Sequence, residues 1–195
     1  MTQIRILFIC HGNICRSAAA EMVLKQMARE AGRKDLQIAS AAATREEIGN
    51  DVYPPMKKAL LAAGYVCEHH AARQTTRADY GAWDYIIGMD DENMWDMRHI
   101  YGGDPEKKLS MLLDWAGTPG QEIDDPWYTR DFTGVLRQIE DGCRGLLTAL
   151  RGKKQQADVF AVRTYDEDGV TDRIGRRRHI SNEKELPEDD TGHCP

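Results

Sequence analysis

The protein is 195 residues long, has a formal net charge of −6 at pH 7, and contains 41% hydrophobic and 30% charged residues. This length predicts one main domain with its own core. The acidic balance argues against nucleic-acid binding. No apolar stretch approaches the roughly 20 residues that span a bilayer, so we expect no membrane partner.

The cysteine content and the first residues indicate a cellular compartment. Five cysteines are an odd number and lack regular spacing, which differs from a secreted disulfide framework. The first ten residues carry no long apolar region followed by a small-residue cleavage site, as a secretory signal would. We therefore expect a cytoplasmic protein whose cysteines are inert, metal-bound or catalytic.

Strand-like and helix-like segments alternate along the first 150 residues. In chain order the pattern predicts a strand at 4–9, a helix at 17–30, a strand at 36–39, a helix at 54–63, a strand at 84–89, a helix at 92–101, a strand at 109–113 and a helix at 132–150. This alternation predicts a three-layer α/β fold, with a central four-stranded parallel sheet flanked by helices.

The composition changes after residue 150. The segment 151–156, R-G-K-K-Q-Q, is typical of a linker, and residues 159–180 predict a β-hairpin around the four-residue turn D-E-D-G at 166–169. A polar, acidic tail that contains Cys194 follows. We expect a main domain at 1–150 and a small C-terminal extension at 151–195, in which the arginines at 176–178 form a solvated face.

The segment C-H-G-N-I-C-R-S at 10–17 joins the first strand to the first helix and predicts a phosphate-binding loop. Backbone N–H groups of such a turn and the positive end of the helix dipole favour a bound anion. Arg16 can hold two oxygens of a tetrahedral oxyanion. The same environment favours the thiolate of Cys10, which would be an in-line nucleophile beneath a bound phosphate.

A carboxylic acid for this chemistry is present in D-D-P-W-Y at 124–128. Cleavage through a cysteinyl-phosphate needs a general acid for the leaving oxygen and then a general base for water, and one carboxyl can do both. The aromatic residues beside it can form a wall for a ring.

Five segments resemble the low-molecular-weight protein tyrosine phosphatases, in that family's order and across about residues 4–150. They are C-H-G-N-I-C-R-S at 10–17, S-A-A-A-T-R-E-E-I-G-N at 40–50, H-A-A-R-Q at 70–74, D-Y-I-I-G-M-D at 84–90 and D-P-W-Y at 125–128. The resemblance implies hydrolysis of phosphotyrosine in protein substrates, by a monomer or weak homodimer, with no metal and no cofactor.

The resemblance also implies residue roles. Cys10 would be the nucleophile, Arg16 the phosphate clamp and Asp125 the general acid and then base, since the family's acid directly precedes the proline and Asp124 does not. The implied phosphate-binding residues are His11, Gly12, Asn13, Ile14, Cys15 and Ser17. The implied loop-supporting residues are Asn13, Ser17, Ser40 and His70, and Gly12 would give the loop room to turn. The implied pocket wall is Glu46, Trp127 and Tyr128. Cys15 would form a reversible disulfide with Cys10 that protects the nucleophile from overoxidation.

Some positions depart from the family's pattern. Glu46 stands where relatives often place an aromatic wall residue, and Trp127 stands where they usually place the first of two tyrosines. Glu46 weakens the case for stacking on a phenyl ring. Ile14 stands where a related branch, the protein-arginine phosphatases, usually has Thr, and this bulkier residue favours phosphotyrosine.

Four alternatives to a tyrosine phosphatase remain open at this point. A zinc site at Cys10 and Cys15 lacks a convincing second pair of ligands, although Cys67, His69 and His70 are close in sequence. An arsenate reductase would need a further redox pair, and Cys67 and Cys143 are far apart and better explained as small hydrophobic residues. A protein-arginine phosphatase is favoured by Glu46. A phosphate-binding module without turnover would not need the nucleophile, clamp and acid together.

Overall fold

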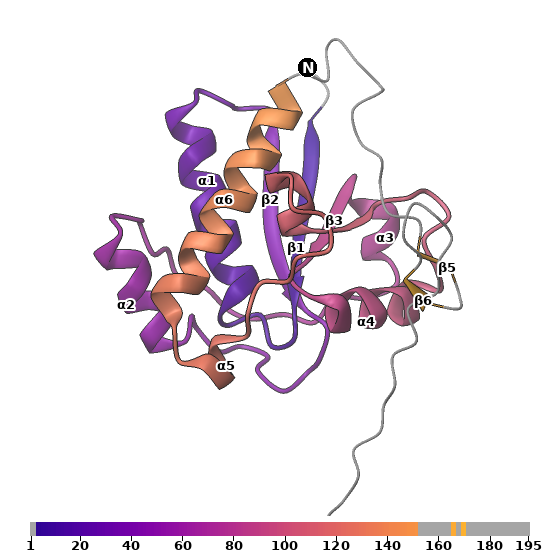
Figure 1. Cartoon of the computed structure of the whole chain (residues 1–195), viewed down its shortest axis with the longest axis horizontal. Helices are drawn as coiled ribbons and strands as arrows, with labels where there is room; N and C mark the ends of the chain where they lie inside the picture. Colours follow the sequence, from indigo (N-terminus) through magenta and orange to yellow (C-terminus); the bar gives the residue numbers. More distant parts are fainter. Residues whose placement is uncertain (1–2, 152–164, 167–168, 171–195) are drawn as a thin grey trace, which may run out of the picture. The chain divides into compact units, whose positions relative to one another are not determined.

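The computed structural model describes residues 3–151, 165–166 and 169–170 (Figure 1). Its sheet has four parallel strands: β1 (Ile4–Cys10), β2 (Leu36–Ala42), β3 (Tyr85–Gly88) and β4 (Leu109–Met111). Their spatial order is β2-β1-β3-β4. This confirms the predicted α/β fold with a central four-stranded parallel sheet.

The helices pack on both sides of this sheet. They are α1 (Arg16–Glu30), α2 (Pro54–Ala62), α3 (Asp79–Ala82), α4 (Asp91–Tyr101), α5 (Pro126–Thr129) and α6 (Phe132–Arg151). α1 packs against β2 and α6, and Figure 1 shows the two helices side by side, while α4 contacts β3 and β4. No helix within residues 3–151 is long and apolar enough to cross a bilayer.

The strand order places a switch point at the centre of the sheet. The β1–α1–β2 connection leads to one edge and the β3–α4–β4 connection leads to the other. Because such crossovers are right-handed, α1 and α4 cover opposite faces. Ligands of open α/β sheets bind at the carboxyl ends of the strands at such a switch point. Cys10, the last residue of β1, therefore lies where this fold binds ligands.

The apolar run at 4–9 becomes the central strand because it is buried on both faces. Ile6, Leu7, Phe8 and Ile9 have no exposed surface, as expected for an inner strand of a parallel sheet. The predicted strand at 36–39 extends further, to Ala42, because β2 pairs with β1 along the whole length of both strands.

The predicted strand at 109–113 is wrong at its carboxyl end. β4 stops at Met111, and Leu112–Ala116 form the 3₁₀ helix η1. Asp114 accepts a hydrogen bond from the Met111 backbone N–H at 3.1 Å and another from that of Gly120 at 2.8 Å, which bends the chain into a turn. Leu112 and Leu113 are buried all the same, so burial in a helical turn produced the same apolar run as a strand.

Two short helices, α3 and α5, lie in segments for which the sequence pattern predicted no helix.

In the C-terminal extension, β5 (Tyr165–Asp166) and β6 (Gly169–Val170) pair antiparallel. Asp166 pairs with Gly169, so both ends of the predicted D-E-D-G turn belong to the strands and two residues lie between them. The predicted linker begins at Arg151, which is instead the last residue of α6. The other linker residues, the rest of the predicted hairpin, the arginines at 176–178 and Cys194 lie outside the described residues.

Candidate active site

The loop between β1 and α1 places a cysteine, a serine and an arginine in a buried position. Cys10 is 3% exposed, and Arg16 and Ser17, the first residues of α1, are buried as well. The Cys10 Sγ atom lies 3.0 Å from the Ser17 hydroxyl oxygen. A hydroxyl at this distance can donate a hydrogen bond to a thiolate. The last strand residue and the first helix residues thus meet across the loop.

Asn13 holds the loop in a backbone conformation that few residues adopt. Its φ is 58°, in the left-handed region that asparagine tolerates better than most residues. Its side-chain amide donates to the hydroxyls of Ser17 at 2.9 Å and Ser40 at 2.8 Å. His70 Nε2 donates to the Asn13 carbonyl at 2.6 Å. The structure thus brings together all four residues predicted to support the loop.

The network extends beyond those four residues. The Ser40 hydroxyl donates to the Glu21 carboxylate at 2.5 Å, and the Arg73 backbone N–H donates to the Asn13 side-chain oxygen at 3.3 Å. Asp79 in turn holds the Arg73 guanidinium, at 3.1 Å. Every polar atom of the Asn13 side chain therefore has a partner from another part of the chain.

Gly12 serves the loop in a different way from the one expected. Its φ is not positive, so the loop does not need glycine there for an unusual turn. A Cβ atom on Gly12 would lie 2.9 Å from the Cγ atom of Glu47. Glycine at this position therefore lets the Glu47 side chain pack directly on the loop backbone, and any larger residue would make that side chain shift.

Arg16 lies between two carboxylates. Its guanidinium donates to Asp90, the N-cap residue of α4, to Asp125 at 2.5 Å and to the Ile123 carbonyl at 3.2 Å. Burial alone would lower the pKa of Arg16, but the charges of Cys10, Asp90 and Asp125 outweigh it and raise that pKa. Arg16 therefore stays cationic, held by the carboxylates of Asp90 and Asp125.

The two neighbouring aspartates at 124 and 125 have different surroundings. Asp125 binds Arg16, and its second carboxylate oxygen accepts from the Trp127 backbone N–H at 2.8 Å, which caps α5. Asp124 is exposed and instead interacts with Gln138 on α6. The structure thus brings Asp125, and not Asp124, to the Arg16 side of the loop.

The rim of the site combines a carboxylate with aromatic side chains. Glu46 accepts a hydrogen bond from His11 Nε2 at 3.1 Å, next to the nucleophile position. Trp127 is 56% exposed and Tyr128 is 83% exposed. Trp127 packs against Tyr53, with ring centroids 5.9 Å apart, and the Arg130 guanidinium lies 5.2 Å from its ring. Tyr128 projects into solvent and forms no ring contact with the residues described.

The cysteines are all free thiols within residues 3–151. Burial raises the pKa of Cys15, and the charges of Cys10 and Asp125 raise it further against the opposing effect of Arg16. Burial likewise raises the pKa of Cys143, which lies in the core between α1 and α6. Cys67 is half-buried, with its Sγ atom 3.5 Å from the Met22 sulfur.

Metal binding finds no support in the arrangement of the side chains. Across the described ranges, no three His, Cys, Asp or Glu side chains converge closely enough to hold a metal ion. His70 is committed to the Asn13 carbonyl and Cys10 to Ser17. The zinc alternative, a site at Cys10 and Cys15 completed from Cys67, His69 and His70, therefore has no converging set of ligands among the described residues.

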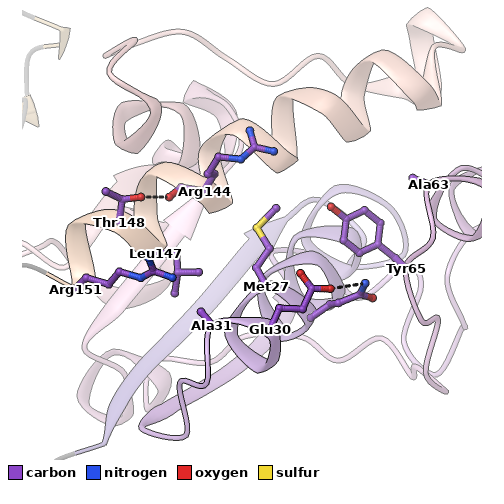
Figure 2. A pocket seen from close by; sticks show the side chains of 10 residues that line it. Met27, Glu30, Ala31, Ala63, Tyr65, Arg144, Leu147, Thr148 and Arg151 are labelled. Carbon is purple, nitrogen blue, oxygen red and sulfur yellow. Dashed lines mark hydrogen bonds between the residues drawn. The ribbon is translucent and has the colours of Figure 1, made fainter.

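A hollow of about 580 Å³ lies away from this site, toward the carboxyl-terminal ends of α1 and α6. Figure 2 shows Arg144, Leu147, Thr148 and Arg151 of α6 facing Met27, Glu30 and Ala31 of α1, with Tyr65 beside them. Arg16 and Glu30 are the first and last of the 15 residues of α1, which places them roughly 20 Å apart at about 1.5 Å per residue. This hollow therefore takes no part in the cluster around Cys10.

The structure adds three residues to the site that sequence reasoning did not assign. Asp90 binds Arg16, Ile123 offers it a carbonyl, and Tyr53 donates its backbone N–H to the Ile14 carbonyl at 2.7 Å. Asp90 had a readable signal, because it stands two residues after β3 and so lies near the carboxyl ends of the strands, as Cys10 does. The contacts of Ile123 and Tyr53 involve backbone atoms and leave no pattern in the sequence.

A parallel sheet with a Cys-x5-Arg-Ser loop at its switch point is the architecture of a cysteine-dependent phosphatase. The family model described as "Low molecular weight phosphotyrosine protein phosphatase" matches residues 5–156. The chain belongs to this family of enzymes.

Individual relatives agree with this assignment. The low molecular weight protein-tyrosine-phosphatase YfkJ of Bacillus subtilis is 33% identical over 154 residues, which are 78% of this chain and 99% of that protein. The low molecular weight phosphotyrosine protein phosphatase 1 of Drosophila melanogaster is 36% identical over 67% of this chain and 84% of its own length. The crystal structure of YfkJ superposes with a TM-score of 0.75, at 32% identity, over 80% of this chain and 99% of YfkJ.

Proposed function

We propose that this protein hydrolyses phosphotyrosine in protein substrates through a cysteinyl-phosphate intermediate on Cys10. The observation that carries the proposal is the convergence of Cys10, Arg16 and Asp125 at one end of the sheet, with Arg16 bonded to Asp125 at 2.5 Å. Family membership supports a phosphoprotein substrate.

Substrate binding would use groups that already face one another. The phosphate dianion would lie on the loop from His11 to Cys15, where backbone N–H groups and the first turn of α1 favour negative charge. Arg16 would exchange part of its bonding to Asp125 for two phosphate oxygens. Asp90 would continue to hold the guanidinium, which makes it a positioning residue.

The first chemical step would transfer the phosphoryl group to sulfur. The Cys10 thiolate forms an S–P bond in line with the bond from phosphorus to the tyrosine oxygen, which breaks. Asp125, which has given up part of its bonding to Arg16, enters this step carrying a proton taken from solvent. It gives this proton to the leaving oxygen, and the dephosphorylated tyrosine departs as a neutral phenol.

The second step would return the enzyme to its starting state. Asp125 accepts a proton from a water molecule, the water oxygen bonds to phosphorus and the S–P bond breaks. The Ser17 hydroxyl, 3.0 Å from Cys10 Sγ, would stabilise the thiolate as it leaves. Inorganic phosphate is then released, and Asp125 returns the proton taken from water to the solvent and bonds to Arg16 again as a carboxylate.

The wall residues support phosphotyrosine as the substrate. Trp127 and Tyr53 offer an aromatic surface beside Asp125. At position 14 this chain has Ile, which is bulkier than the Thr that the arginine-specific branch usually has there and favours phosphotyrosine. Glu46 is the observation that favours phosphoarginine as a second candidate, because its carboxylate stands at the rim, 3.1 Å from His11.

Two measurements test the proposal. Reduced protein with a metal chelator should release p-nitrophenol from p-nitrophenyl phosphate, and Cys10→Ser should lose this activity while still binding vanadate. Cys67→Ser is the matched control because Cys67 lies outside the site, and it should remain active. Absence of turnover by the reduced wild type, or full activity of Cys10→Ser, would refute the proposal.

The substrate assignment needs a separate comparison. Rates on matched peptides with phosphotyrosine, phosphoarginine or phosphoserine should rank phosphotyrosine first. A faster rate on phosphoarginine would move the protein to the second candidate.

A further inference from the structure

A side pocket of about 380 Å³ opens next to the phosphate-binding loop. Ile14 of the loop forms one wall, and the segment from Glu47 to Lys57, which leads into α2, forms the rest. We use the term side pocket for this hollow only. Nothing in the proposed chemistry at Cys10 uses it.

Three contacts fix the side pocket relative to Cys10. The Tyr53 backbone N–H donates to the Ile14 carbonyl at 2.7 Å. The Glu47 side chain packs on Gly12, where a Cβ would lie 2.9 Å from Glu47 Cγ. The Tyr53 ring also packs against Trp127, which follows Asp125. When the phosphotyrosine of a peptide lies in the loop, a neighbouring residue of the same peptide would therefore lie at the mouth of the side pocket.

The walls of the side pocket are mostly apolar. Ile14, Val52, Tyr53 and Pro54 supply carbon surface along it. Such a surface suits the methylene stem of a long side chain, which can pack on apolar groups and keep its charged end at a polar one.

The charged groups in the side pocket leave one carboxylate available. Asp51 and Lys57 bind each other at 2.8 Å, and this bond lowers the pKa of Asp51 to about 2, so this pair is internally neutralised. One Glu47 oxygen accepts from the Asn50 amide at 2.6 Å. The other Glu47 oxygen has no hydrogen-bond donor among the described residues. The net charge of the lining is therefore negative, and the carboxylate of Glu47 is its source.

We propose that the side pocket receives a lysine or arginine side chain of the substrate, next to the phosphotyrosine, with its stem on Val52 and Tyr53 and its cation on Glu47. This inference rests on the proposed phosphatase function and adds the class of phosphopeptide that the enzyme prefers. An acidic residue at the same position of the peptide would be repelled by the Glu47 carboxylate. Lys57 would not offset this repulsion because it is already paired with Asp51.

The test uses peptides in which the phosphotyrosine is surrounded by alanine. Arg or Glu is placed, one at a time, at each of the two positions before and the two positions after the phosphotyrosine, and kcat/KM is compared between the Arg and Glu peptides at each position. For at least one position, kcat/KM should be about three- to tenfold higher with Arg than with Glu, as expected for one partly exposed ion pair. Glu47→Gln should abolish this ratio, and Glu47→Arg should invert it. The ratio cancels any uniform change in turnover.

A matched control removes the same charge elsewhere. Glu30→Gln, at the far end of α1, should keep the wild-type ratio. The proposal fails if Arg and Glu peptides are turned over equally at every position, or if Glu47→Gln keeps the wild-type ratio. Turnover of p-nitrophenyl phosphate, which has no neighbouring residue, separates this failure from that of the phosphatase function: if the wild type does not hydrolyse it, both proposals fall.

Discussion

The guanidinium of Arg16 binds the carboxylate of Asp125, 109 residues away in the chain, at 2.5 Å. The proposed phosphate clamp and the proposed general acid are therefore partners of each other before substrate arrives. In the proposed mechanism, a phosphate group would compete with Asp125 for Arg16, and the same event would free Asp125 to act as the general acid. Substrate binding and acid activation would then be coupled through this one ion pair.

Asp125→Asn should slow hydrolysis of an alkyl or phenyl phosphate with a poor leaving group by about 10²- to 10⁴-fold, the range for loss of a general acid. The loss should be smaller with p-nitrophenyl phosphate, whose leaving group needs less help from a proton. Steady-state kinetics on both substrates measure this. Asp124→Asn, which removes the neighbouring carboxylate, should behave like the wild type, and equal losses in the two variants would contradict the assignment.

Two substitutions separate what the backbone conformation of Asn13 and what its side chain contribute to stability. Asn13→Ala loses the bonds to Ser17 and Ser40 and also places alanine at a φ of 58°, which costs about 1–2 kcal/mol beyond the lost bonds. Asn13→Gly loses the same bonds without that strain. Both variants should lose activity, and urea unfolding should find the alanine variant the less stable. Equal stabilities would show that the left-handed backbone carries no cost.

The two loop cysteines should differ in reactivity. Because burial raises the pKa of Cys15, iodoacetamide at pH 7 should alkylate Cys10 and leave Cys15 unmodified, and inorganic phosphate should slow the reaction at Cys10. In a separate sample that has not been alkylated, peroxide should produce a Cys10–Cys15 disulfide, seen by mass spectrometry as a loss of about 2 Da on the peptide that contains both. Sulfonic acid on Cys10 beside a reduced Cys15 would argue against a protective disulfide.

Asp79 should make stability depend on pH in the acid range. Burial opposes its ionisation, but hydrogen bonds from Arg73, the Thr76 backbone and Trp83 outweigh burial and lower its pKa. A carboxyl whose pKa is lower in the folded state stabilises above its unfolded pKa of about 4 and loses this contribution as the pH falls through the folded pKa. Asp79→Asn should thus be less stable than the wild type in urea at pH 7, and this gap should narrow below pH 4. A constant gap from pH 7 to pH 3 would refute the role of the charge.

Gly145 allows η1 to pack against α6. A Cβ atom there would lie 2.1 Å from the Trp115 carbonyl oxygen, so Gly145→Ala should destabilise the protein by about 1–3 kcal/mol through overpacking, despite the better helix propensity of alanine. Thermal or urea unfolding measures this. Gly81→Ala in α3 is the control, since no heavy atom lies within 4 Å of the added Cβ. Equal stability of the two variants would show that the contact can relax at no cost.

The sequence predicted the sheet and the long helices because those elements have strong periodic patterns. The run at 4–9 had one interpretation, as a buried strand, and α6 has one apolar face along its whole length. η1 was missed because Leu112 and Leu113 are buried in a helical turn that depends on Asp114 and on the small residues of α6. α3 and α5 are too short to show a period.

For the site, the sequence identified the residues whose side chains carry a chemical signature. The structure brings Cys10, Arg16 and Asp125 together with the supporting residues Asn13, Ser17, Ser40 and His70. The sequence could not predict that Glu46 bonds to His11, because the conformation of the loop at 44–50 decides which way this side chain points. The catalytic roles themselves stay predictions until the variants above are measured.

The partners of Arg16 also bear on how the protein becomes active as it folds. Asp90 and Asp125 lie 74 and 109 residues beyond Arg16 in the chain, so the partners of its guanidinium come from segments that are synthesised well after the loop itself. Contacts of such large sequence separation have a high loop-closure cost and tend to form late. Catalytic competence would then mark the completion of folding, and a nascent chain that had released only its first hundred residues would hold the nucleophile without the means to use it.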